Sequence, residues 1–279
     1  MKIVRSPETM SAVCAGLKSK KQTIGFVPTM GALHKGHLEL VRQAKRRCDK
    51  VVVSIFINPT QFGPKEDFRK YPRNFRKDSS FLKKEGVDFI FLPSNKSMYP
   101  EGYKTFVKVG DLGKIMCGVS RPDHFKGVAT IVSKLFNIVK PDMAFFGAKD
   151  FQQQAIIKKM VIDLNMGVKI ITIPTVREKD GLAMSSRNAY LSDKERKAAS
   201  VLYRSLRMAK GLIDNGERNP RTVVAKIRTM IMKEKLFKID YIEVRNPGTL
   251  EKISKIKRET LIALAAYIGK TRLIDNIVV

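Results

Sequence analysis

Short apolar runs and longer amphipathic segments alternate through the first 175 residues of the chain. The short runs are rich in β-branched and aromatic residues and are bounded by Gly, Pro or Asn, which is the pattern of buried strands. We predict five such strands, at Ile24–Pro28, Val51–Ile57, Asp88–Leu92, Met143–Phe146 and Lys169–Ile173.

The segments between these runs have helical periodicity. From Val128 to Val139 the apolar residues recur at intervals of three and four, and a similar stripe runs from Leu38 to Cys48. Alternation of strands and helices predicts an α/β fold with a doubly wound parallel sheet, covered on both faces. Ligands of such folds bind at the carboxyl ends of the strands, so the loops that directly follow the strands are the first place to look for chemistry.

The pattern changes near residue 176. A capping box at Ser192–Glu195 predicts a helix that runs toward Asp214, and Asn219-Pro220 predicts the start of a second helix through Met232. Two strand-like runs follow, Ile239–Val244 and Leu261–Ile268. We therefore predict two domains: residues 1–175 form the larger α/β domain, and residues 176–279 form a smaller α+β domain.

Composition fits a globular protein of the cytoplasm. The chain has 279 residues, of which 43% are hydrophobic and 29% charged, enough for two packed cores. No apolar run approaches the length of a membrane span, and the first residues lack the layout of a secretory signal. The three cysteines, Cys14, Cys48 and Cys117, lie far apart with no CxxC, which argues against a disulfide framework and a zinc knuckle.

The net charge of +28 raises the question of a nucleic-acid partner. The excess is spread along the chain, at +17 in residues 1–175 and +11 in residues 176–279. There is no basic arm, and the aromatic residues are not interleaved with arginines as stacking platforms would be. We therefore expect no nucleic-acid partner, although an RNA-binding module stays as an alternative. A basic surface also attracts anionic substrates.

Two histidines follow the first predicted strand. The segment PTMGALHKGH, residues 28–37, places His34 and His37 one turn apart at the expected start of a helix. Backbone N–H groups and the helix dipole favour an anion there, and Gly36 allows a phosphate to approach the backbone closely. A zinc site is disfavoured because no third ligand lies nearby in the sequence.

Three further loops carry polar residues suited to a nucleotide or a small acid. Gln61 in FINPTQFG (56–63) offers both a donor and an acceptor. Lys149 and Asp150 in FFGAKDFQQ (145–153) suit a phosphate and a ribose hydroxyl, and Arg187 beside two serines offers forked donors to phosphate oxygens. Each loop alone has a common composition, but together they indicate a nucleotide site.

Five stretches of the chain together resemble the pantothenate synthetase (pantoate–β-alanine ligase) family. They are PTMGALHKGH (28–37), FINPTQFG (56–63) with YPR (71–73), RPDHFKGV (121–128), FFGAKDFQQ (145–153) and VREKDGLAMSSRNAYLS (176–192). They occur in the family's order, cover the first two thirds of the chain and contain all three histidines. The resemblance implies a Rossmann-like sheet of the nucleotidyltransferase type with a His-x-Gly-His loop, and a C-terminal domain that closes over the active site.

The resemblance also implies the reaction. ATP and pantoate give an enzyme-bound pantoyl-adenylate and pyrophosphate, and β-alanine then displaces AMP to form pantothenate. Mg²⁺ is expected with ATP as cosubstrate, and a homodimer is expected. The nearest alternative is another adenylyl-transferring enzyme of the same fold, such as a phosphopantetheine or nicotinate-mononucleotide adenylyltransferase, which uses a phosphorylated acceptor.

Site residues follow from the same resemblance, position by position. The catalytic set is His34, His37, Lys149 and Arg187. The ATP site comprises Met30, Gly31, Ala32, Leu33, His34, Lys35, Gly36, His37, Gly147, Ala148, Lys149, Asp150, Val176, Met184, Ser185, Ser186 and Arg187. Gln61 and Gln153 are expected to hold the substrates pantoate and β-alanine, and Asp78 stands at the family's metal-associated position.

Two features of the motifs leave questions open. Ala148 stands where many family members carry Glu or Gln, and the roles of Arg121 and His124 in RPDHFKGV are not assigned. The residue types otherwise suit the reaction. A carboxylate that attacks an α-phosphate is repelled by the negative charge of the phosphates, so the site needs positive groups and hydrogen-bond donors. His37, Lys149, Arg187, Mg²⁺ and the helix N–H groups are expected to neutralise the triphosphate first.

Overall fold

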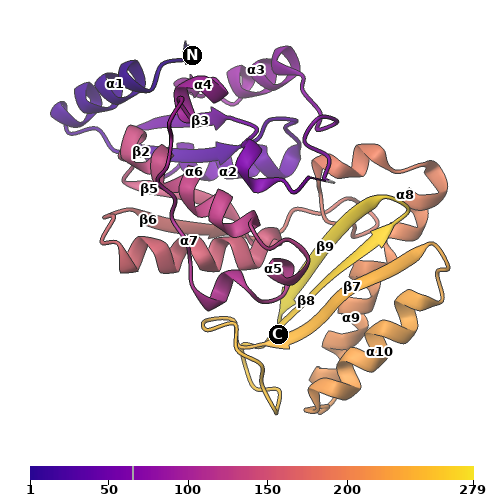
Figure 1. Ribbon diagram of the computed structural model, residues 1–279. Coiled ribbons are helices and arrows are strands. Elements are labelled where there is room, and N and C mark those ends of the chain that lie inside the picture. The colour runs from indigo at the N-terminus through magenta and orange to yellow at the C-terminus, as the bar shows by residue number, and fades with distance from the viewer. Residues whose placement is uncertain (65) are drawn as a thin grey trace. The chain divides into compact units, whose positions relative to one another are not determined.

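The computed structural model describes residues 1–64 and 66–279. A six-stranded parallel sheet forms the centre of the first part of the chain (Figure 1). Its strands are β1 (Lys2–Val4), β2 (Ile24–Thr29), β3 (Lys50–Ile55), β4 (Phe89–Phe91), β5 (Met143–Gly147) and β6 (Lys169–Ile173). All five strands expected from the sequence are present, with small shifts at their ends, and the short β1 is an addition at the sheet edge.

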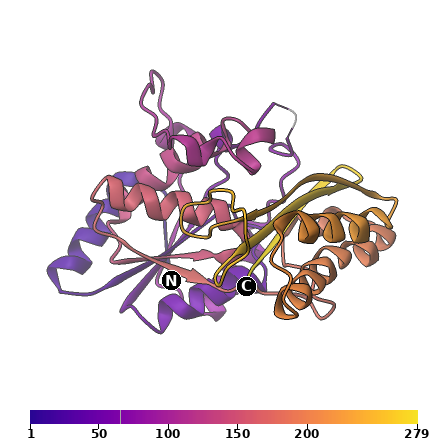
Figure 2. The same cartoon turned by 90° about the horizontal axis from the view of Figure 1, so that it is seen from below.

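Helices cover both faces of this sheet (Figure 2). The α-helices are α1 (Pro7–Ser19), α2 (Lys35–Lys45), α3 (Phe75–Lys84), α4 (Asn95–Met98), α5 (Cys117–Ser120), α6 (His124–Val139) and α7 (Phe151–Asp163); the 3₁₀ turns are η1 (Pro59–Gln61), η2 (Asp111–Gly113) and η3 (Ala148–Asp150). Neighbouring strand residues point into opposite cores. Phe26 packs in the core formed with α1, α6 and α7, and Val27 packs in the core formed with α2 and α3. The predicted doubly wound α/β fold is confirmed.

The strand order places two loops side by side. The order is β1-β4-β3-β2-β5-β6, so the chain builds the sheet in one direction from β2 and in the other direction from β5. Strands β2 and β5 are neighbours, with Gly25 opposite Met143. Their carboxyl ends form the topological switch point, where doubly wound sheets bind ligands. The loop that starts at Met30 and the residues that follow Gly147 leave the sheet there.

The C-terminal part of the chain has its own core. Its elements are η4 (Ser186–Tyr190), α8 (Asp193–Ala199), α9 (Val201–Asp214), α10 (Pro220–Met232) and an antiparallel sheet of β7 (Phe237–Arg245), β8 (Leu261–Ile268) and β9 (Thr271–Val278). Helices α9 and α10 pack on this sheet. The helix expected from Ser192 to Asp214 is two helices that meet at Ser200, and β9 was not expected.

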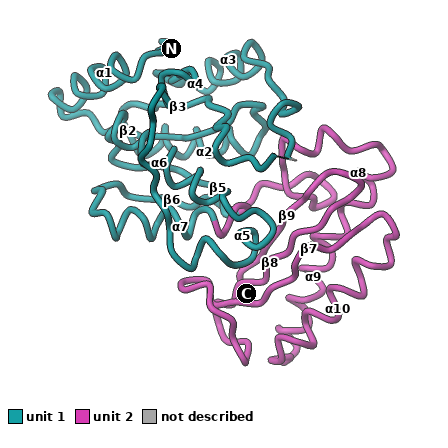
Figure 3. The backbone as a smooth tube through the Cα atoms, viewed as in Figure 1, with its two compact units in different colours: residues 1–148, 153–174 teal, residues 149–152, 175–279 magenta. Residues whose placement is uncertain are grey.

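The chain divides into two compact units (Figure 3). The first unit comprises Met1–Ala148 and Gln153–Pro174, and the second comprises Lys149–Gln152 and Thr175–Val279. The four residues that follow Ala148 therefore belong with the C-terminal sheet, although they lie between β5 and α7 in the sequence. Among the described residues, none of the helices combines the length and the apolar character that a membrane crossing requires.

Candidate active site

The loop between β2 and α2 ends in two histidines that cap the helix. His34 is the N-cap, and its Nδ1 accepts the Gly36 N–H at 3.1 Å. The His37 Nδ1 accepts the His34 N–H at 3.4 Å, which completes a reciprocal capping box. A backbone N–H can only donate, so each ring carries its proton on Nε2. In this geometry His37 can donate a hydrogen bond from Nε2, and its expected role at the triphosphate stays a prediction.

A buried carboxylate holds the same loop in an unusual conformation. Gly31 and Ala32 have φ of +80° and +50°, a region that costs energy for alanine. The Asp78 Oδ2 accepts the Ala32 N–H at 2.9 Å, and Oδ1 accepts the Leu33 N–H at 2.8 Å. Asp78 is only 2% exposed. Burial raises the pKa of the Asp78 carboxyl, and the two amide hydrogen bonds oppose this shift. Asp78 thus fixes the path of the predicted ATP loop.

Asp78 was also predicted to bind a metal ion. Among residues 1–64 and 66–279, no group of three His, Cys, Asp or Glu side chains could hold a metal ion. A nucleotide-bound Mg²⁺ needs only one or two protein carboxylates, because phosphates and waters supply its other ligands. Each Asp78 oxygen keeps a second lone pair beside its amide hydrogen bond. The metal role of Asp78 stays a prediction.

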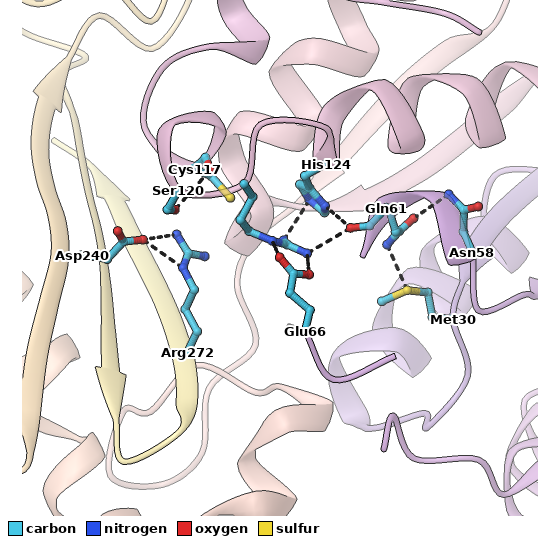
Figure 4. Close-up of polar contacts among 10 residues, drawn as sticks. Met30, Asn58, Gln61, Glu66, Cys117, Ser120, His124, Asp240 and Arg272 are labelled. Carbon is cyan, nitrogen blue, oxygen red and sulfur yellow. Dashed lines mark hydrogen bonds and ion pairs between the residues drawn. The ribbon is translucent and has the colours of Figure 1, made fainter. Parts of the chain in front are cut away.

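Gln61 lies in η1, directly after β3, and its side chain is held at both ends (Figure 4). Its Nε2 donates to the Met30 Sδ at 3.0 Å, and its Oε1 accepts from the Asn58 Nδ2 at 3.2 Å. The structure therefore brings together two predicted site residues, Met30 and Gln61, from adjacent loops. Gln153 lies in the first turn of α7, and no hydrogen bond joins it to Gln61 among the described residues.

Asn58 is an organising residue that sequence reasoning missed. It is 1% exposed and donates from Nδ2 both to Gln61 Oε1 and to the Gly127 carbonyl oxygen. Its Oδ1 accepts the Tyr99 hydroxyl at 2.7 Å. The Asn-Pro pair was visible as a turn signal, but that signal does not reveal a buried amide with partners from distant segments.

In the second unit, strand β9 holds the segment that contains Lys149 and the loop that leads to Arg187. The Asn276 Nδ2 donates to the Lys149 carbonyl oxygen at 2.8 Å, and the Lys149 Nζ lies 3.8 Å from the Asp150 carboxylate. Arg177 forms two hydrogen bonds to Asp275, of which the one from Nη2 to Oδ1 measures 2.9 Å. Neighbouring positions on β9 therefore anchor both segments: Asn276 holds the residues after β5, and Asp275 holds the loop that begins at Val176.

That loop folds back on itself before it reaches Arg187. Its turn is closed by the Met184 N–H, which donates to the Val176 carbonyl oxygen at 3.0 Å, and by a bridge between Arg177 and Ala183. Ser185 caps η4 by accepting the Arg187 N–H at 3.3 Å. Val176 and Met184 are thus neighbours, and the predicted residues Ser185, Ser186 and Arg187 lie at the start of one helical turn.

Fold and loops together define an α/β nucleotide-binding protein, with a helix N-terminus at the switch point of the sheet. A family model described as pantoate-beta-alanine ligase matches residues 2–278. The pantothenate synthetase of Caldicellulosiruptor bescii is 56% identical over 279 residues, which is 100% of this chain and 99% of that protein. That of Carboxydothermus hydrogenoformans is 55% identical over the same coverage.

Solved structures of the same family are also similar to this chain. Pantothenate synthetase from Thermus thermophilus superimposes with a TM-score of 0.95 at 41% identity and covers 99% of both chains. Pantoate-beta-alanine ligase from Francisella tularensis, complexed with beta-gamma ATP and beta-alanine, has a TM-score of 0.83 at 38% identity, over 100% of this chain and 97% of that one. The chain belongs to the pantoate–β-alanine ligase family, as its motifs predict.

We expect Asp78→Asn to weaken ATP binding. An asparagine turns an NH₂ group toward one of the two amide donors, so one charge-assisted hydrogen bond is lost, at a cost of about 1.5–3 kcal/mol. The Michaelis constant for ATP should rise by roughly tenfold or more. Titration of Mg²⁺ separates the two roles of Asp78: excess Mg²⁺ restores the variant if its defect is in metal binding, and has no effect if the loop is displaced.

Asn276→Asp tests the support of Lys149. A carboxylate cannot donate to the Lys149 carbonyl oxygen, so we expect the Michaelis constant for ATP to rise by roughly tenfold from the lost bond and the added repulsion. Asn246→Asp is the matched control, because the exposed Asn246 acts through its Oδ1, which accepts the Gly248 and Thr249 N–H groups as a carboxylate also can. Equal Michaelis constants for ATP in Asn276→Asp and Asn246→Asp would show that Asn276 does not hold Lys149 in place.

Proposed function

We propose that this chain catalyses the ATP-dependent condensation of (R)-pantoate with β-alanine, releasing AMP and pyrophosphate. The observation that carries the proposal is the His34–His37 capping box, which puts two imidazoles at a helix N-terminus at the switch point of the sheet, in a chain that belongs to this ligase family. The names of the relatives agree, and the Francisella tularensis protein was solved with beta-gamma ATP and beta-alanine.

The first step forms the mixed anhydride. A pantoate carboxylate oxygen attacks the α-phosphorus of ATP, a P–O bond forms, and pyrophosphate leaves with the electrons of the broken bond. In this proposal Gln61 and Gln153 hold pantoate, while Lys149 and Arg187 offset the negative charge of the triphosphate. His34 and His37 donate from Nε2 to phosphate oxygens. Asp78 would be the carboxylate for Mg²⁺, which would enter with ATP and would reduce the negative charge on the phosphates.

The second step uses the amine of β-alanine. The neutral amine attacks the acyl carbon of the adenylate, a C–N bond forms, the C–O bond to AMP breaks with its electrons leaving on AMP, and the nitrogen gives up one proton. The chain needs no covalent nucleophile for either step, because binding and alignment of the reactants supply the acceleration. Between the steps the adenylate must be protected from water, so we propose that the C-terminal domain of residues 176–279 closes over the site of domain 1–175. The proposal includes a homodimer that works in the cytoplasm.

Pyrophosphate exchange tests the proposed reaction directly. With β-alanine omitted, labelled pyrophosphate should enter ATP only when pantoate is present, because only the adenylation step is then reversible. Exchange without any acid, or with a phosphorylated acceptor instead of pantoate, would contradict the proposal and favour an adenylyltransferase. RNA binding with a steep salt dependence and no exchange would favour the RNA-binding alternative.

His37→Ala removes one donor from the proposed phosphate site. We expect the rate of pantoate-dependent exchange to fall by about 10²–10³-fold, which corresponds to about 3–4 kcal/mol. His37→Gln is the informative companion, because its amide nitrogen can take the place of the Nε2–H donor and should recover part of the rate. An alanine variant that exchanges at nearly the wild-type rate would show that His37 does not serve the phosphates.

A further inference from the structure

We propose that the RPDHFKGV motif positions the pantoate-binding turn: Arg121, His124 and Gly127 hold the backbone of Asn58–Gln61 in place. The inference rests on the proposed function, in which Gln61 contacts pantoate. His124 and Gly127 lie one turn apart at the start of α6, Arg121 lies three residues before it, and each of the three contacts the turn after β3. We call Asn58–Gln61 the pantoate turn.

Gly127 permits a backbone-to-backbone approach that no other residue allows. A Cβ atom on Gly127 would lie 2.3 Å from the Thr60 carbonyl oxygen and 2.7 Å from the Gln61 nitrogen, well inside van der Waals contact. The Gly127 carbonyl oxygen in turn accepts a hydrogen bond of 3.1 Å from the Asn58 Nδ2. Helix α6 is therefore pressed directly against the pantoate turn, and any side chain at position 127 would push the turn away.

The carbonyl oxygen of Gln61 is held by two side chains, Arg121 and His124, and Figure 4 shows His124 beside it. The His124 Nδ1 lies 2.9 Å from this oxygen, and the Arg121 Nη2 donates to it at 3.2 Å. A carbonyl oxygen only accepts, so the His124 proton is on Nδ1. The Arg121 Nη1 lies 3.1 Å from the His124 Nε2 and can only donate, so Nε2 accepts. His124 is thus the neutral Nδ1–H tautomer, and both lone pairs of the Gln61 carbonyl are engaged.

Glu66 fixes the arginine that makes these contacts. Its carboxylate receives two parallel hydrogen bonds from Arg121, one of them 2.7 Å long from Nε to Oε1. The two side chains are 11% and 25% exposed for Arg121 and Glu66. Burial acts to raise the pKa of Glu66, but the hydrogen bonds and charge of Arg121 outweigh it and lower this pKa. The ion pair therefore holds the planar Arg121 guanidinium in the position from which it donates to Gln61.

Together these contacts hold Gln61 from two sides. Its backbone is held by Arg121 and His124, and its side chain is held by Asn58 and Met30. A side chain that is fixed before the ligand arrives loses little entropy on binding, so the arrangement favours tight and selective binding of the acid. Arg121, His124 and Gly127 are positioning residues, because they act on pantoate through Gln61.

The test compares the Michaelis constants for pantoate and ATP in the exchange assay, with β-alanine omitted. Arg121→Lys loses the fork to Glu66, and we expect the constant for pantoate to rise by roughly tenfold or more, while the constant for ATP changes by less than about twofold. Arg42→Lys is the matched control, because Arg42 forms a comparable forked pair with Glu85 at the other end of α2. We expect both of its constants to stay at the wild-type values.

A second pair of variants tests the close approach. Gly127→Ala should raise the constant for pantoate by roughly 100-fold through displacement of the turn. Gly16→Ala in α1 is its control, since nothing lies within 4 Å of a Cβ atom there. Thermal melts report whether each variant is folded. If Gly127→Ala fails to fold, Arg121→Lys and His124→Gln carry the test, and the nitrogen shifts of His124 report its tautomer in the wild type.

The outcomes separate the inference from the proposed function. Wild-type protein without pantoate-dependent exchange would contradict the proposed function, and an unchanged pantoate constant in Gln61→Ala would remove the basis of the inference. If both of those results are as expected, unchanged pantoate constants in folded Arg121→Lys and His124→Gln overturn the inference. A loss of turnover that follows thermal stability, with both constants unchanged, also overturns it, because that result describes a merely structural role.

Discussion

The pair of hydrogen bonds from the Ala32 and Leu33 amides to the buried Asp78 carboxylate is the contact on which the nucleotide loop depends. Without it, a left-handed alanine next to a left-handed glycine would have little reason to persist. The direction of the loop decides where α2 begins, and the start of α2 decides where His34 and His37 place their Nε2–H groups. One carboxylate from α3 therefore sets the geometry of the loop that is proposed to bind the phosphates, at the cost of its own desolvation.

The same arrangement recurs at the other loops. Three of the segments that are proposed to touch a substrate are each held by a polar side chain from a distant part of the sequence. Asp78 holds the loop after β2, Arg121 holds the pantoate turn, and Asn276 holds Lys149. Because these supports bind carbonyl and amide groups, they fix the backbone of the proposed site before any substrate binds.

Sequence patterns predicted the parts of the fold that depend on local chemistry. Strands β2 to β6 are short runs of residues that suit a buried sheet, and the capping box at Ser192 was visible because it lies within four residues of its helix. Strand β9 was missed because the charged residue Asp275 interrupts its apolar pattern. Asp275 is buried in the strand only because Arg177, 98 residues away in the sequence, pairs with it.

The motif residues of the candidate site were named from the resemblance to the family. The supporting contacts were beyond such reasoning, because Asp78 binds amides 46 and 45 residues away in the sequence and Arg121 pairs with Glu66 across 55 residues. Only the folded chain brings these partners together.

A crystal structure with a non-hydrolysable ATP analogue tests the central claim most directly. We expect the phosphates at the N-terminus of α2, within hydrogen-bond distance of the Nε2 atoms of His34 and His37, with the Ala32 and Leu33 amides still bound to Asp78. A nucleotide bound elsewhere, with the His37 ring turned away from every phosphate, would contradict the account.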